Sequence, residues 1–191
     1  MNHLHSLVLA ITLLVGSVSV ATAQDYDKGV AAYNAGDYQT ALLYFKDIAD
    51  GSPYAYGYWI EQDCDVLLKN SCFLVPIGTN GPAEYFLGLM YENGQGVLQH
   101  YAEAVKWHRL GAEQGYAPAQ NNLAFMYQLG EGVLESNVMA HMWFNIASVN
   151  GAPKSGEWRD ELAGQMTNAD ISKAQEMARE CLSSNYQNCG E

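Results

Sequence analysis

Four cysteines are the residues of this 191-residue sequence whose type and spacing most directly suggest chemistry. They are Cys64, Cys72, Cys181 and Cys189, and seven residues separate the members of each sequential pair. An even number of cysteines in an exported chain points to disulfides. The short loops favour the pairs Cys64–Cys72 and Cys181–Cys189 over the crossed pairings. A zinc site is the alternative, but zinc usually takes tighter Cys-x-x-Cys pairs or histidines on a helix.

Other reactive side chains do not form a known catalytic pattern. The sequence has no phosphate-binding loop, no Gly-x-Ser-x-Gly elbow and no His-Glu-x-x-His motif. His108 and His141 fall in corresponding helices of the repeat described below, but at different positions, which disfavours a shared ligand role. We therefore expect no catalytic residue, no bound metal and no cofactor, and hence no enzyme.

The first 23 residues have the features of a signal peptide. An apolar run from Leu7 to Val15, interrupted only by Thr12, is followed by small residues and the cleavage pattern Ala21-Thr22-Ala23. A membrane-spanning helix needs about 20 apolar residues, so no membrane span is expected in the mature chain. The residue after the cut is Gln24 and not Cys, which disfavours a lipid anchor. The sequence predicts cleavage after Ala23 and a periplasmic or secreted protein.

Composition limits the class of partner. Apolar residues make up 49% of the chain and charged residues 16%, as in ordinary folded proteins. The formal net charge of −12 would repel nucleic-acid phosphates and anionic lipid head groups. Nucleic-acid binding is therefore not expected, and a protein partner with a basic surface is favoured.

An internal repeat of 36 residues organises the middle of the chain. Shifting the segment that starts at Ala83 by 36 residues superimposes it on the segment that starts at Ala119, with eleven identities. The residues that define the repeat are Leu87, Tyr91, Gly94, Gly96, Ala104 and Trp107 in the first copy and Leu123, Tyr127, Gly130, Gly132, Ala140 and Trp143 in the second. Small or apolar residues occupy these positions, which indicates a structural role.

The spacing within each copy predicts a helical hairpin. Leu87 and Tyr91 lie on one helical face, and Gly94 and Gly96 end that helix in a turn that needs positive φ. A second helix is expected over residues 101–113, with Ala104 and Trp107 on its buried side. Two antiparallel helices cannot bury one face alone, so such units stack and share a core.

The stretch from Ala83 to Val133 resembles Sel1-like repeats, a variant of the tetratricopeptide repeat. It contains the turn LGLMYENGQGV, then the Ala104–Trp107 helix and the exit AEQG. The resemblance implies an all-α fold, a short right-handed α-solenoid of antiparallel helix pairs. It also implies, as a class, proteins that act as scaffolds for assembling other proteins.

The flanks of the repeat predict its ends. Residues 24–53 resemble the shortened opening unit of the family through GDYQTALLYF, with helices over 26–34 and 37–50 and Asp37 as N-cap. The two full repeats are expected at 82–118 and 119–154. Residues 155–191 should form capping helices over 155–165 and 168–182, with Thr167 as the N-cap of the last one.

Residues 54–81 interrupt the regular pattern with an irregular insert. The insert carries Tyr54, Tyr56, Tyr58 and Trp59, followed by Cys64 and Cys72. Because tyrosine and tryptophan dominate interface hot spots, these aromatics are a candidate partner-binding patch. The competing interpretation, which we favour, is that they close the seam between the opening hairpin and the first repeat.

The sequence therefore predicts an exported, non-enzymatic scaffold that binds another protein or peptide, with its oligomeric state left open. The competing function is a cell-wall protein that binds or hydrolyses peptidoglycan or a β-lactam, as in the cysteine-rich Sel1-like proteins. Those proteins have a disulfide with the same seven-residue interval inside each repeat. This chain has Ala112 and Gln120 at the corresponding places.

Overall fold

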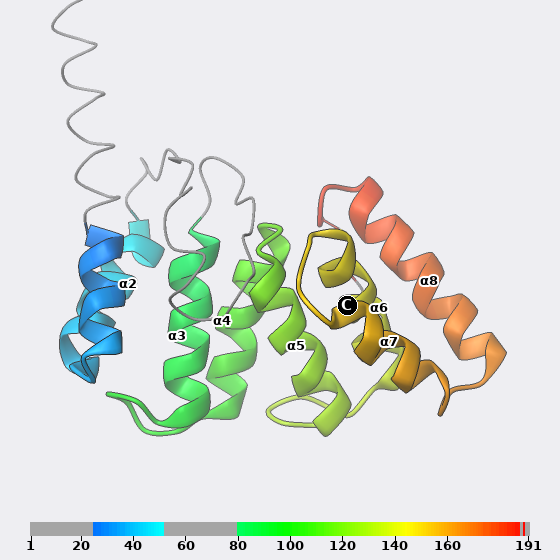
Figure 1. The fold of residues 1–191 in the computed structure, drawn as a ribbon, viewed down its shortest axis with the longest axis horizontal. Coiled ribbons are helices and arrows are strands. Elements are labelled where there is room, and N and C mark those ends of the chain that lie inside the picture. Colours follow the sequence, from blue (N-terminus) through cyan, green and yellow to red (C-terminus); the bar gives the residue numbers. More distant parts are fainter. Residues whose placement is uncertain (1–24, 52–79, 188, 190–191) are drawn as a thin grey trace, which may run out of the picture.

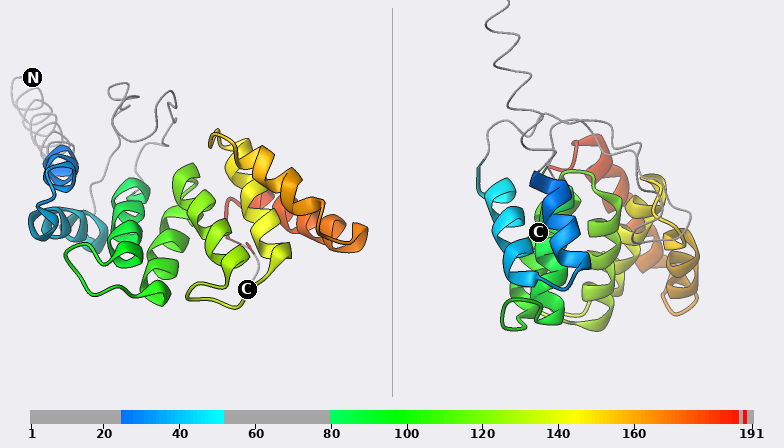
Figure 2. Two further views of the ribbon diagram at one scale, coloured as in Figure 1. Left: turned by 60° about the horizontal axis from the view of Figure 1, so that its bottom comes forward. Right: turned by 60° about the vertical axis from the view of Figure 1, so that its left-hand side comes forward.

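The computed structural model describes residues 25–51, 80–187 and 189, and these residues form helices and turns with no strand among them. A helix over residues 25–34 is followed by α2 (Tyr38–Gly51), α3 (Gly81–Asn93), α4 (Tyr101–Glu113), α5 (Ala117–Leu129), α6 (Asn137–Val149), α7 (Ser155–Ala163) and α8 (Asn168–Ser183). The helices stand side by side in chain order, from blue to red in Figure 1. Figure 2 shows the same row from two further directions. The all-α hairpin stack expected from the sequence is confirmed.

The helix ends follow local chemistry that was readable in the sequence. Asp37 Oδ1 accepts a hydrogen bond from Thr40 N at 3.2 Å, and Thr167 Oγ1 accepts one from Asp170 N at 3.1 Å. Both residues therefore cap their helices as predicted. The expected second helix of the repeat, residues 101–113, has the bounds of α4. The helix expected over 155–165 is shorter, because it ends at Ala163 and Gly164 follows as its C-cap.

The repeat positions form the shared core. Leu87, Leu123, Ala104 and Ala140 are fully buried, each on the inner side of its hairpin. Trp143 is also fully enclosed, whereas its counterpart Trp107 is only half-buried. The difference follows from position in the stack, since α7 and α8 both pack against α6. The repeat pattern predicts both tryptophans on the buried side, and burial is complete for Trp143 and partial for Trp107.

The opening hairpin packs directly against the first full repeat. The rings of Phe45 and Phe86 stack at a centroid distance of 4.7 Å, and Tyr33 meets Phe86 edge-on at 5.0 Å. Tyr26 completes this aromatic cluster at 6.2 Å from Phe86. The described residues thus place α2 and α3 as neighbours in space, although the 28-residue insert separates their units in sequence.

A close contact of a turn glycine recurs at two junctions between successive units. Gly96 has a φ of 73°. It lies so close to the start of α2 that a Cβ would be 2.9 Å from the carbonyl oxygen of Tyr38. Gly132 has the same φ, and its Cβ would overlap the backbone of Tyr101 at the start of α4. Each turn therefore rests on the second helix of the preceding unit, and glycine is required there for two reasons, positive φ and close approach.

Candidate functional site

The turns of the two repeats expose one leucine each. Leu98 is 91% exposed and Leu134 is 89% exposed, and they occupy the same position of the 36-residue repeat. The preceding valines, Val97 and Val133, are partly buried against the core. Both turns lie at the lower edge of the stack in Figure 1. This edge therefore presents large apolar side chains to solvent at a regular spacing.

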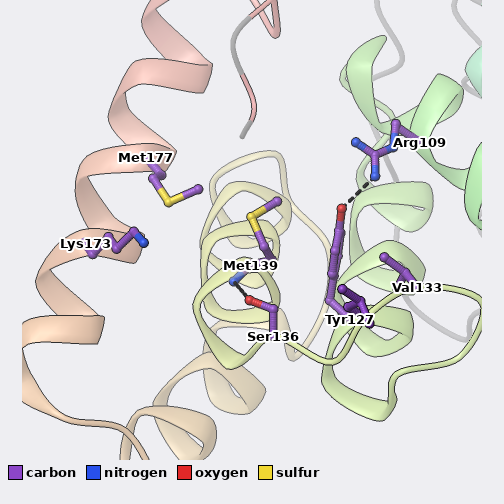
Figure 3. Close-up of a pocket in the computed structure, with 8 residues that line it drawn as sticks. Arg109, Tyr127, Val133, Ser136, Met139, Lys173 and Met177 are labelled. Carbon is purple, nitrogen blue, oxygen red and sulfur yellow. Dashed lines mark hydrogen bonds between the residues drawn. The ribbon is translucent and has the colours of Figure 1, made fainter. Parts of the chain in front are cut away.

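A groove of about 560 Å³ opens beside the second turn. It lies between the turn that joins α5 to α6 and the last helix, α8. Its lining residues come from α4, α5, the turn, α6 and α8, and they are Arg109, Tyr127, Val133, Leu134, Ser136, Met139, Lys173 and Met177. Figure 3 shows Met139 near the middle, with Lys173 and Met177 on one wall and Arg109 and Tyr127 on the other.

The groove combines an apolar surface with two cations. Arg109 Nη2 donates a hydrogen bond to the Tyr127 hydroxyl at 2.6 Å, and its guanidinium lies 6.0 Å from the centroid of that ring. Lys173 is exposed on α8. Ser136 is turned toward its own helix, where its hydroxyl accepts a hydrogen bond from Met139 N at 3.3 Å. The groove can thus bind an apolar side chain and an anionic group together.

The buried side chains of His108 and Glu84 each have a polar partner within the stack. His108 is fully buried, and its Nε2 lies 3.2 Å from Glu92 Oε2. Glu84, which is 4% exposed, accepts a hydrogen bond from Gln114 Nε2, and Gln114 Oε1 accepts one from Asn80 N at 2.6 Å. Burial raises the pKa of Glu84 from 4.5 to about 7, despite the opposing hydrogen bond from Gln114. These contacts tie α3 to the end of α4.

His141 is the other buried histidine and has a different environment. It is 2% exposed, and its Nδ1 has no hydrogen-bond partner among the described residues. Burial lowers its pKa, and the nearby Arg159 lowers it further. A buried imidazole of this kind is kept neutral by its surroundings. His108 and His141 are both enclosed by the packed helices, so neither lies on the open surface where a substrate could reach it.

Two features are absent from the described part of the chain. No group of three or more His, Cys, Asp and Glu side chains within residues 25–51, 80–187 and 189 is placed to hold a metal ion. Across the same part of the chain, no helix is both long and apolar enough to cross a membrane.

Of the predicted disulfides and the aromatic patch, the Cys181–Cys189 pair alone lies in the described part of the chain. Cys181 and Cys189 form a disulfide with Cα atoms 4.5 Å apart, which is the sequential pairing expected. The Cys64–Cys72 pair and the aromatic patch of Tyr54, Tyr56, Tyr58 and Trp59 lie outside the described residues.

The positions that hold cysteines in the cysteine-rich Sel1-like proteins make a different contact in this chain. Ala112 and Gln120 are both fully buried, and Gln120 Nε2 donates a hydrogen bond to the Ala112 carbonyl oxygen at 2.9 Å. The same two positions are therefore neighbours in space, but a hydrogen bond joins α4 and α5 where those proteins have a covalent bridge.

The groove itself was not recognised from the sequence. Tyr127 had been identified, as a structural residue of the repeat, but Arg109 and Lys173 had not been singled out. These two residues are 64 positions apart and belong to α4 and α8, so no local spacing relates them. The one available signal was rarity, since the chain has only nine lysines and arginines.

Comparisons with known proteins agree with this architecture. The Sel1 repeat family matches residues 81–116 and 117–150. A protective antigen present in uropathogenic Escherichia coli strains, which displays an SLR fold, is similar over 86% of this chain with a TM-score of 0.66 and 21% identity. A Sel1 repeat protein from Oxalobacter formigenes is similar over 86% of this chain with a TM-score of 0.53 and 26% identity.

The matched chains are longer than this one. The similar region covers 31% of the Escherichia coli protein and 58% of the Oxalobacter formigenes protein. A search of curated protein sequences found no match. The 36-residue period, the paired turn glycines and the stacked hairpins nevertheless agree with the family match over two adjoining segments. Residues 81–150 are two consecutive Sel1 repeats.

Proposed function

We propose that this chain is an exported, non-enzymatic scaffold that binds a partner protein through its helical stack. Sel1 repeats commonly mediate protein–protein interaction and are typically non-catalytic. The observation that carries the proposal is the edge of the stack, where Leu98 and Leu134 are 91% and 89% exposed. These leucines occupy matching repeat positions and contribute nothing to the core, so they are suited to burial against another protein.

Export is the second part of the proposal and rests on the sequence. The apolar run from Leu7 and the Ala21-Thr22-Ala23 pattern support cleavage after Ala23. The Cys181–Cys189 disulfide is also suited to an oxidising compartment, since disulfides are rare in the reducing cytosol. Edman sequencing or mass spectrometry of the protein from its own cells should find Gln24 at the N-terminus. An intact leader on protein in the cytosolic fraction would contradict this part.

The scaffold proposal is preferred to cell-wall binding on one structural ground. The resemblance to the cysteine-rich proteins would require bridged cysteines within each repeat. Here the corresponding residues Ala112 and Gln120 are joined by a hydrogen bond of 2.9 Å. The charge of −12 also favours a partner with a basic surface.

The proposal is tested by crosslinking the tagged protein in its own compartment and identifying captured proteins by quantitative mass spectrometry. An unrelated exported protein with the same tag is the control. The proposal expects one protein, or one small set of subunits, to be enriched only with this chain. Sedimentation of the purified protein with peptidoglycan, without a selectively captured protein, would favour the cell-wall function instead.

A further inference from the structure

We infer that the groove between the α5–α6 turn and α8 is a docking site for a partner segment that places a carboxylate beside a bulky aliphatic side chain. The groove is the 560 Å³ space whose walls carry Arg109 and Lys173. This inference deepens the proposed function and rests on it, because it names the surface of the scaffold and the chemistry of the segment that binds there.

The charge of the groove is opposite to that of the chain. Arg109 and Lys173 are two of only nine basic residues, and none of the eight residues that line the groove is acidic. Within the described part of the chain, no salt bridge joins either cation to a carboxylate. A carboxylate that enters the groove would meet Arg109 and Lys173 at contact distance, where the attraction between opposite charges is strongest. A carboxylate from outside is the complementary group.

The geometry of Arg109 suits that role. One of its terminal nitrogens donates to the Tyr127 hydroxyl at 2.6 Å, which holds the guanidinium against the wall. A guanidinium has five N–H donors in a fixed plane, so this bond leaves donors for a carboxylate. Lys173 stands on the opposite wall, on α8 (Figure 3). A single segment lying in the groove can therefore meet both cations.

The apolar part of the groove calls for an aliphatic side chain next to the carboxylate. In Figure 3, Met139 lies between the two walls and Met177 lies beside Lys173 on α8. Methionine adapts its shape to different apolar partners. Leu134, at 89% exposed, forms the rim on the turn. A bound Leu, Ile or Met side chain would cover these surfaces and be covered by them.

Two of the residues that line the groove differ in type from their counterparts in the first repeat. The position of Met139 is occupied by Glu103 in the first repeat, and the position of Ser136 by His100. Glu103 is itself paired with Lys106. The first turn therefore has an exposed leucine but an acidic side chain where the second has methionine. This difference supplies a matched internal control.

The test begins with a library of random peptides displayed on phage and selected on the purified mature protein with its disulfides intact. We expect enrichment of peptides that carry Asp or Glu within a few residues of Leu, Ile or Met. An enriched peptide is then synthesised with a fluorescein label, and its affinity is measured by fluorescence anisotropy. Replacing its acidic residue by the amide should weaken binding about tenfold, as for one charge-assisted hydrogen-bonded contact.

Two pairs of variants locate the site on the protein. Leu134→Ser should weaken peptide binding at least about tenfold, whereas Leu98→Ser, at the matching position of the first turn, should change it less than about twofold. Lys173→Gln should weaken binding about fivefold, and Arg179→Gln, the same charge change on the same helix, should have little effect. All four side chains are exposed or nearly so, and circular dichroism checks that the fold is kept.

Several outcomes would overturn the inference. They are the absence of any enriched peptide, enrichment of basic peptides, equal effects within a variant pair, and binding of dodecanoate in place of the peptide. The last would assign the groove to a fatty acid. Repeating the cellular crosslinking with Leu134→Ser and Leu98→Ser separates the two proposals. Unchanged capture of a partner by both variants would leave the scaffold function standing and remove the groove from it.

Discussion

Glu84 should make the stack less stable as the pH rises through neutrality. Glu84 is 4% exposed and lies in the first turn of α3, and burial raises the pKa of its carboxyl from 4.5 to about 7. The folded protein therefore binds this proton more tightly than the unfolded chain does. The stabilising contribution is complete below about pH 4.5 and is lost as the pH rises to and beyond about 7.

The size of the effect follows from the two pKa values. The pKa of Glu84 is 4.5 in the unfolded chain and about 7 in the folded protein. Because of this difference, the free energy of unfolding falls by about 2.5 kcal/mol between about pH 5 and pH 8 through this one group. Glu84→Gln keeps an oxygen that can accept the hydrogen bond from Gln114 but carries no titrating proton. We expect the variant to be more stable than the wild type by about 2–3 kcal/mol at about pH 8, and by less than about 1 kcal/mol at about pH 5.

Urea unfolding, followed by tryptophan fluorescence at the two pH values, measures the difference in free energy of unfolding between Glu84→Gln and the wild type. The comparison between variant and wild type removes the contributions of every other titrating group. Glu176→Gln, an exposed change of the same charge on α8, is the control and should give nearly the same small difference at both pH values. If Glu84→Gln differs from the wild type by the same amount at both pH values, the buried carboxyl does not titrate as argued.

Three further predictions address the turns, the disulfide and the buried imidazole. Gly132→Ala should lower the free energy of unfolding by about 3 kcal/mol or more, since its Cβ would overlap the backbone of Tyr101. Gly151 also has positive φ but open space around it, so Gly151→Ala should lower the free energy of unfolding by only about 1–2 kcal/mol. Equal losses in urea unfolding would show that backbone strain alone acts. Replacing Cys181 and Cys189 by serine should lose roughly 2–3 kcal/mol, and non-reducing peptide mapping should recover these two cysteines together; a crossed pairing would refute the assignment. Acidification from about pH 7 to about pH 5 should destabilise the wild type more than His141→Gln, because burial lowers the pKa of this histidine and the unfolded chain then binds the proton more tightly. Parallel pH profiles would count against that account.

The hairpins could be predicted from the sequence because their determinants are local. Each determinant acts within one or two helical turns. The determinants are the three-residue and four-residue steps between apolar positions, the turn glycines, and the caps at Asp37 and Thr167. The 36-residue period then implied stacking, because a single hairpin leaves one face uncovered. The degree of burial of Trp107 and Trp143 was beyond this reasoning, since it depends on which helices lie outside each unit.

The groove depends on relations of another kind. Arg109 and Lys173 come together only because α8 packs against α6 in the finished stack. The elevated pKa of Glu84 likewise depends on burial between α3 and α4, which a glutamate near a helix start does not reveal. Such features arise from the arrangement of distant segments, and sequence spacing carries no record of them.

The glycine contacts between units have a consequence for how such a chain can lengthen. The same contact joins Gly96 to Tyr38 and Gly132 to Tyr101, so each junction copies the one before it. Duplication of one 36-residue period would supply both halves of a new junction together, and the array could grow without a newly evolved interface. The contact is made by Gly96 and Tyr38 themselves and does not depend on the number of residues between α2 and α3. A long insertion can therefore enter the chain at that point while the spacing of the units stays the same.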